Sequence, residues 1–293
     1  MMFDALGKHL CVVLALVAAP ALLNAQPATS GTPSAEDATA SGRLLFAPLI
    51  AHHVEPRVGF TRLVGEHRLR LDIGNSIDLV EFSDVFTDDR LAIGADFFTW
   101  TSLRQEGDFH FPVDAVDYLF GVNASWRHRI TADAAVSARL RLSHISAHLV
   151  DGSYDKAANT WRDGQLPRVY SREFLDLIFA WEYRNILRLY GGGHYVYHID
   201  PAHLGTLGLQ AGAEIWWTNA IAPGVHLLAA YDVRLLDTGA ARTAHALQAG
   251  VKLGHRHGSG VSIYLAGYHG PSQHGEYFDR IWSYWGPGMN VDF

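Results

Sequence analysis

The clearest candidates for catalytic chemistry lie in residues 143–151 (SHISAHLVD), where His144, Ser146 and His148 occupy alternate positions. A serine hydroxyl becomes a good nucleophile when an adjacent imidazole takes its proton, and a carboxylate or amide must hold that imidazole in the right tautomer. Residues two apart on a strand lie on the same side, with about 6 to 7 Å between their backbones. His144 can therefore reach the Ser146 hydroxyl, and the pair is a candidate for attack on an ester.

Glu173 is the candidate third member of this site. Glu173 lies an even number of positions before the apolar residues Leu175, Leu177 and Phe179. In a strand it therefore faces the same side as they do. If the intervening connection pairs residue 150 with about residue 169, Glu173 lies opposite Ser146 and one step from His144. A carboxylate that could orient the imidazole is then available.

The segments that must position these side chains alternate apolar and polar residues with period two, as strands do. In residues 116–127, Tyr118 and Phe120 share one face, whereas Asp117 and Arg127 lie on the other. The apolar faces are aliphatic or small with Trp and Tyr at their ends, and the opposite faces carry charges of both signs. This pattern indicates lipid outside and a packed polar lumen inside. A soluble sandwich with the same alternation stays an alternative.

The chain is expected to be all-β: a closed, transmembrane, antiparallel β-barrel of about twelve strands, an even number as in bacterial barrels. Its long connections, near residues 104–113, 150–168 and 270–276, would all lie outside the cell. The C-terminal Phe293 predicts recognition by the barrel-assembly machinery. The expected strands cover residues 57–63, 68–82, 91–104, 114–127, 132–149, 169–183, 186–199, 205–217, 224–236, 242–254, 259–269 and 277–293.

Three regions are expected along the chain. Residues 1–25 are typical of a signal peptide, because Lys8 precedes an apolar run that is too short, at about 14 residues, to span a bilayer as a helix. Residues 26–43 are rich in Ala, Thr, Ser and Pro, which indicates a flexible leader. Residues 44–293 are left for the outer-membrane β-barrel.

The composition argues against nucleic-acid-binding proteins and helical membrane proteins. The net charge of −7 argues against a nucleic-acid partner, which would require clustered Lys and Arg. The one cysteine, Cys11, lies in the expected signal peptide, so the exported chain would have none. No run of about 18 apolar residues follows that segment, which excludes a helical membrane protein. The expected location is the outer membrane of a Gram-negative bacterium.

Several stretches resemble a bacterial group known as domain-of-unknown-function family 1207. They are residues 143–151, residues 189–193 (LYGGG), residues 247–250 (LQAG), and the tail from Tyr268 through Ser272, Gly275 and Asp279. The resemblance covers nearly all of the exported chain. It implies an outer-membrane-type barrel and supplies no activity.

A second, local resemblance concerns the His-x-Ser pair, which is similar to that of outer-membrane phospholipase A and of the lipid A deacylase. It implies that His144 is the general base, Ser146 the nucleophile and Glu173 the residue that orients the base, acting on outer-leaflet phospholipid or lipopolysaccharide. It also suggests calcium as a cofactor; no other cofactor is expected. Those enzymes follow the serine with Asn, where this chain has Ala147.

Other functions stay open at this point. The three polar residues of the candidate site could simply lie at the level of the lipopolysaccharide head groups. Metal binding by alternate histidines is undecided, as are an adhesive or structural role and the oligomeric state. A narrow passive channel is another candidate, and its lumen would carry Asp96, Asp117, Arg139, Arg141, Asp176, Glu182, Arg188, Glu214, Asp232, Arg234 and Lys252.

Overall fold

The computed structural model of this chain describes residues 44–83 and 89–293. The expected signal peptide and leader lie outside the described residues. Among the described residues there is no helix long and apolar enough to cross a bilayer.

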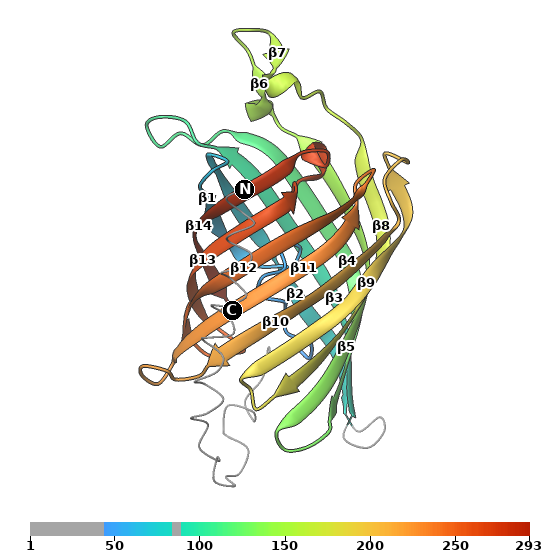
Figure 1. The fold of residues 1–293 in the computed structure, drawn as a ribbon, viewed down its shortest axis with the longest axis vertical. Coiled ribbons are helices and arrows are strands. Elements are labelled where there is room, and N and C mark those ends of the chain that lie inside the picture. Colours follow the sequence, from blue (N-terminus) through green and yellow to red (C-terminus); the bar gives the residue numbers. More distant parts are fainter. Residues whose placement is uncertain (1–43, 84–88) are drawn as a thin grey trace. The chain divides into compact units, whose positions relative to one another are not determined.

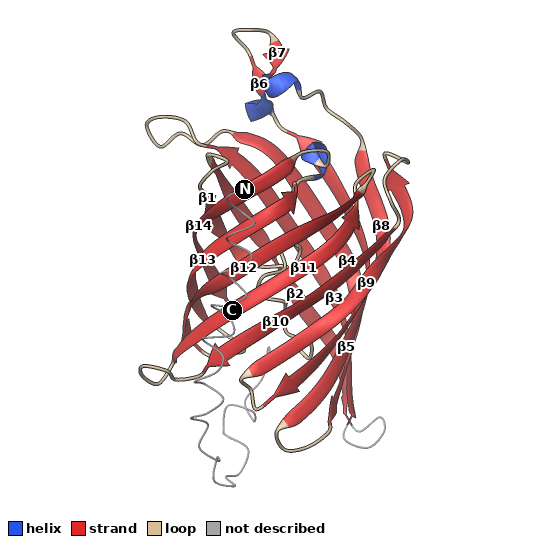
Figure 2. Cartoon of the chain, viewed as in Figure 1, coloured by secondary structure: helices blue, strands red, loops and turns tan. Residues whose placement is uncertain are grey.

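Within these ranges the strands form one closed antiparallel barrel, in which the first strand pairs with the last (Figures 1 and 2). The prediction of a twelve-stranded, closed, all-β barrel is therefore confirmed. The barrel strands are β1 (Val58–Leu63), β2 (Arg68–Ser83), β3 (Asp89–Arg104), β4 (Val113–Arg129), β5 (Ala134–Leu149), β8 (Tyr170–Tyr183), β9 (Leu187–Asp200), β10 (Leu207–Trp217), β11 (Val225–Asp237), β12 (Ala241–Gly254), β13 (Gly260–Pro271) and β14 (Ile281–Asp292).

Two connections contain structure that the sequence pattern did not predict. The long connection between β5 and β8 holds a short hairpin, β6 (Tyr154–Asp155) and β7 (Thr160–Trp161), flanked by the 3-10 turns η1 (Asp151–Ser153) and η2 (Arg162–Gly164). The connection between β13 and β14 holds η3 (Gly275–Tyr277). Because consecutive strands are antiparallel, both connections lie at one end of the barrel, which we call the loop end.

The opposite end is closed by short turns. Between β8 and β9, Arg184 and Asn185 have φ angles of 52° and 54°. Two consecutive positive φ angles are typical of the tight hairpin turns whose twist matches that of antiparallel strands.

The faces of the barrel are inverted relative to a soluble sandwich. On β5, Leu140 and Leu142 are 44% and 43% exposed, whereas Arg139 and Arg141 between them are buried. The same inversion holds on β4, where Phe120 and Val122 are exposed and Asn123 is buried. An apolar outer wall of this kind is stable in hydrocarbon and not in water. The protein is therefore an outer-membrane barrel, with the predicted orientation of its side chains.

Residues 44–57, which we call the lumen plug, precede β1 and pack inside the barrel. The Ile50 amide donates to Glu214 Oε1 of β10 at 2.8 Å. Phe46 and Leu49 are buried in a cluster with Ile178 and Tyr190 of the wall. The sequence pattern did not reveal this plug, because its residues follow neither a strand nor a helix period.

The inverted orientation predicts a stability effect at Leu140. Replacing Leu140 by Arg should lower the free energy of unfolding by roughly 2 to 4 kcal/mol, because a charge near mid-membrane would meet lipid. Chemical unfolding in lipid vesicles measures this difference. Leu166→Arg is the matched control: Leu166 is exposed in the connection between β5 and β8, so its replacement should change stability little. Equal effects of the two substitutions would contradict the orientation.

Candidate functional site

The outer wall of β5 carries the candidate His-x-Ser pair near the loop end. His144 and Ser146 are half-buried, while Ile145 and Ala147 between them are buried on the lumen side. His148 is exposed on the same outer face. Parity along the strand predicted this placement, and the alternation of burial agrees with it.

Glu173 lies on β8, directly opposite His144. The expectation that it would face Ser146 is wrong by two residues, and Ser146 instead faces Ser171. The reason is that β5 continues past the start of β8: Leu149 pairs with Ala115 of β4, and β8 is already paired from Tyr170 onward. The hairpin is therefore asymmetric, and the carboxylate meets the imidazole and not the hydroxyl.

The register brings the imidazole of His144 into direct contact with the carboxylate of Glu173. His144 Nδ1 lies 2.5 Å from Glu173 Oε1, and the two side chains are 27% and 24% exposed. An ionised carboxylate only accepts hydrogen bonds, so Nδ1 carries the proton and donates it. His144 Nε2 is then the atom that is free to take a proton from elsewhere. This is the tautomer that a general base requires.

The aromatic surroundings fix the plane of the His144 ring. The Phe120 ring of β4 lies beside it, with 4.8 Å between the ring centroids and 36° between the planes. Phe120 is also the residue that pairs with His144 across β4 and β5. The imidazole is therefore held between an aromatic ring on one neighbouring strand and a carboxylate on the other.

Ser146 is near this pair but not hydrogen-bonded to it. Among the residues that the structure describes, its hydroxyl makes no hydrogen bond with His144 or Glu173, although His144 and Ser146 share a face two residues apart. The conformation described therefore lacks the hydrogen bond between the nucleophile and Nε2. Such loose geometry is common in catalytic sites without bound substrate.

His198 and Ser171 also reach Glu173, which the sequence pattern did not predict. His198 Nδ1 forms a hydrogen bond with Glu173 Oε2, and Ser171 Oγ donates to Oε1 at 3.3 Å. A strict alternation on β9 would have turned His198 inward, away from Tyr195. A bulge opposite the Glu173–Phe174 step inserts one residue and turns His198 outward. No spacing in the sequence marks that bulge.

A metal centre is not supported at this position. Both Glu173 oxygens are occupied by histidines, and within residues 44–83 and 89–293 no group of three or more His, Cys, Asp or Glu is arranged to hold a metal ion. Calcium normally takes six to eight oxygen ligands. The donor set around Ser146 therefore does not fit calcium.

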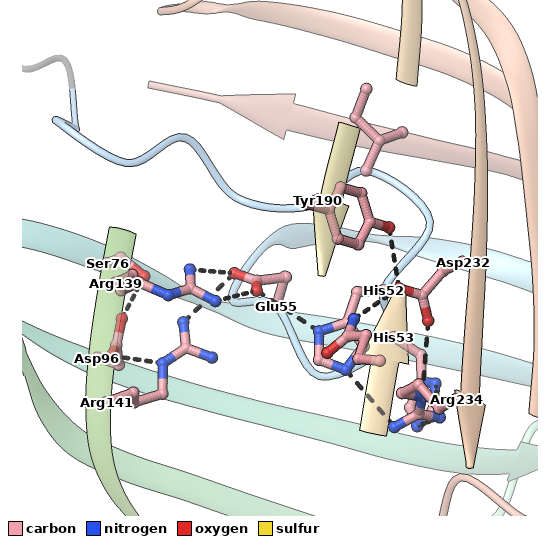
Figure 3. A network of polar contacts seen from close by, with 12 residues as sticks. His52, His53, Glu55, Ser76, Asp96, Arg139, Arg141, Tyr190, Asp232 and Arg234 are labelled. Carbon is pink, nitrogen blue, oxygen red and sulfur yellow. Dashed lines mark hydrogen bonds and ion pairs between the residues drawn. The ribbon is translucent and has the colours of Figure 1, made fainter. Parts of the chain in front are cut away.

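The lumen side of the same strand carries a different network (Figure 3). Arg139 Nη1 donates to Glu55 Oε2 of the lumen plug at 2.9 Å, and Arg141 Nη2 lies 3.3 Å from the same oxygen. Arg141 Nε also donates to Asp96 Oδ2 at 3.0 Å. Glu55 is fully buried. The plug is thus bound to the wall by charge-assisted hydrogen bonds.

Further contacts join the plug to the opposite wall. Arg234 of β11 contacts the rings of His52 and His53, and Asp232 accepts a hydrogen bond from Tyr190 at 2.9 Å. The residues expected to line a channel therefore include many that are buried in contacts across the lumen. This packing argues against a passive pore in the conformation described.

The whole barrel matches known families and folds. A family model described as "Protein of unknown function (DUF1207)" matches residues 22–293. Among curated proteins, none matches the chain in sequence.

The similar solved structures include an active-site mutant of outer membrane phospholipase A from Escherichia coli. It has a TM-score of 0.51 and 11% identity, covering 85% of this chain and 92% of that chain. Another structure of outer membrane phospholipase A from the same organism has a TM-score of 0.47 and 11% identity, covering 77% and 78%. LpxR from Salmonella typhimurium has a TM-score of 0.34 and 12% identity, covering 77% and 88%. At these identities the likeness shows the fold alone.

The buried network predicts a large effect at Glu55. Glu55→Gln should lower the free energy of unfolding by about 3 to 5 kcal/mol, because it leaves the guanidinium groups of Arg139 and Arg141 without their shared carboxylate. Unfolding followed by tryptophan fluorescence measures it. Glu81→Gln is the control, since the Glu81–Arg90 pair is exposed and should contribute about 0 to 1 kcal/mol. Similar losses in both variants would contradict the role of the plug.

The plugged lumen also predicts that the protein does not conduct ions. The purified native protein in planar bilayers should show no discrete conductance steps, because the plug fills the space through which ions would pass. Recordings at several voltages test this. Steps in the native protein whose ion preference changes in Arg139→Ala would restore the channel as its function.

Proposed function

The chain belongs to the DUF1207 family of proteins of unknown function, and from that premise we propose that this member is a lipid-ester hydrolase of the outer membrane. Its substrates are acyl esters of phospholipid or lipid A in the outer leaflet. In this proposal the loop end of the barrel faces the cell exterior, so the outer wall of β5 meets the outer leaflet.

The observation that carries the proposal is the contact between His144 Nδ1 and Glu173 Oε1 on a wall that faces lipid. A buried ion pair in a soluble core would be structural. On this face, the exposed neighbours Leu142 and Leu175 are suited to contact acyl chains, so the His144–Glu173 pair lies beside the position of a lipid substrate. Serine at the next outward position supplies the one group that the pair lacks.

The reaction follows from these three side chains. His144 Nε2 takes the proton of the Ser146 hydroxyl as its oxygen attacks the ester carbonyl carbon. Glu173 stabilises the imidazolium that forms. The C–O bond to the glycerol or sugar breaks, and its oxygen receives the proton from His144. Water then attacks the acyl–serine ester by the same route, releases a fatty acid and restores the serine.

The position of the site explains how a water-insoluble substrate would reach it. Acyl esters lie at the border between the hydrocarbon and the head groups. The site lies on β5 between Leu142 and the strand end at Leu149, and in this proposal the loop end lies at the level of the head groups. The lipid needs only lateral diffusion to arrive, so the closed lumen is no obstacle. No step passes through calcium, because the donor set does not fit it.

The test is fatty-acid release by the refolded native protein from phospholipid and from lipid A, with calcium supplied so that its lack cannot cause a failure. Ser146→Ala should reduce the rate by at least about a thousandfold, because it removes the hydroxyl that attacks the ester. Ser143→Ala is the matched control, since Ser143 is on the same strand but its hydroxyl is buried on the lumen side. Heat-modifiable gel mobility should be unchanged in both variants.

Two results would overturn the proposal. One is the absence of release by the native protein on both substrates. The other is an equal rate in the native protein and in Ser146→Ala.

A further inference from the structure

A cavity lies inside the loop-end half of the barrel, on the other side of the wall from the candidate active site. Its volume is about 60 Å³, and its lining includes His53, Asp117, Arg172, His194, Arg234 and His274. One water molecule needs about 10 to 15 Å³ measured this way, so the cavity has room for several waters or one small solute. The lining thus brings three imidazoles and two guanidinium groups together with the carboxylates of Asp117 and Asp237.

Arg172 supplies a positive charge that the protein does not neutralise. It points inward from β8 and stacks over the Phe174 ring, with 5.2 Å from the guanidinium carbon to the ring centroid. Within the described part of the chain, no carboxylate lies within ion-pair distance of Arg172, and its buried Nε has no hydrogen-bond partner. Arg172 is half-buried, so its guanidinium can donate to an anion in the cavity without first leaving an ion pair.

Arg234 is different, because it is already engaged. Its Nε lies 3.6 Å from Asp232, and its terminal nitrogens contact His52 and His53 of the lumen plug. Of the two guanidinium groups in the lining, that of Arg172 is therefore the one without a counterion.

His274 supplies a second unsatisfied group. Its Nδ1 lies 2.6 Å from Asp117 Oδ2, and the Gly275 amide donates to the other oxygen, Oδ1, at 2.7 Å. Asp117 thus fixes the ring and neutralises it when it is protonated. The side chain of His274 is 1% exposed, and its Nε2 has no partner within the described residues. Buried groups without partners call for an explanation, such as a bound ion.

We propose that this cavity binds a small phosphate-bearing anion from solution. Guanidinium groups bind phosphate oxygens through two parallel N–H bonds, and a protonated imidazole adds a third donor. Arg172 and His274 are such donors in the lining, one from β8 and one from the connection between β13 and β14. The lining includes Asp237, which is exposed at the loop end of β11. The strand wall separates the cavity from lipid.

The proposal is independent of the hydrolase. The two sites lie on opposite faces of the wall, and none of the residues of the outer cluster lines the cavity. A cavity filled only by water would give no saturable binding of phosphate.

The test is calorimetric titration of the full refolded chain in detergent with inorganic phosphate, against chloride at equal ionic strength. The native protein should bind phosphate saturably at one site, and Arg172→Gln should weaken binding at least about tenfold. Arg90→Gln is the matched control, because Arg90 is exposed, lies at the opposite end and is paired with Glu81. It should bind as the native protein does.

A second variant and a lipid arm complete the test. If Arg172→Gln lacks the heat-modifiable mobility of a folded barrel, His274→Gln carries the test with the same expected loss. Repeating the titration in phospholipid bicelles should give the same affinity, because lipid head groups cannot enter. No saturable binding by the native protein, native affinity in the folded variants, or competition by bicelle lipid would each overturn the proposal.

Discussion

The alternation of inward and outward side chains along β5 is the constraint on which both the lumen network and the outer site depend. One register sends Arg139 and Arg141 inward to Glu55 and sends His144 and Ser146 outward to lipid. A shift by one residue would expose the guanidinium groups to hydrocarbon and bury leucines in a charged lumen. The register is therefore strongly specified, and the outer cluster inherits its position from the ion pairs on the other face.

The lumen plug is bound to that wall and to other strands of the barrel. Glu55 joins two arginines of β5, and the plug contacts β10 and β11 on the far side. A catalytic pair works best on a support whose rotamers are fixed by packing and by a second layer of hydrogen bonds. A barrel that acts on membrane lipid has no need of an open channel, so a filled lumen and a reactive outer wall are compatible. The cavity at the loop end is the part of the lumen that the plug leaves unfilled.

Features that depend on the regular alternation of a strand could be predicted from the sequence. Features that depend on a bulge, on a connection or on an irregular segment could not. The strand ranges and the face that His144 and Ser146 share with Leu140 and Leu142 follow from period two. The outward direction of that face was predicted from the Trp and Tyr at the ends of the apolar faces and from the charges of both signs on the opposite faces. The partner of Glu173 depended on the length of the connection after β5, which no local pattern reveals. His198 reached Glu173 through a bulge, and the plug has no period at all. Side-chain rotamers, which decide whether Ser146 meets His144, also lie beyond what spacing can predict.

The most direct test of this account is the oxygen accessibility of nitroxide labels along β5 in proteoliposomes, with single cysteines at Leu142, Ser143, Ile145 and Ser146. Oxygen concentrates in lipid, so power saturation should show high accessibility at Leu142 and Ser146 and low accessibility at Ser143 and Ile145. That alternation would establish that the candidate nucleophile faces lipid on a wall whose other side is the packed lumen. A uniform profile, or one with the opposite phase, would contradict the account.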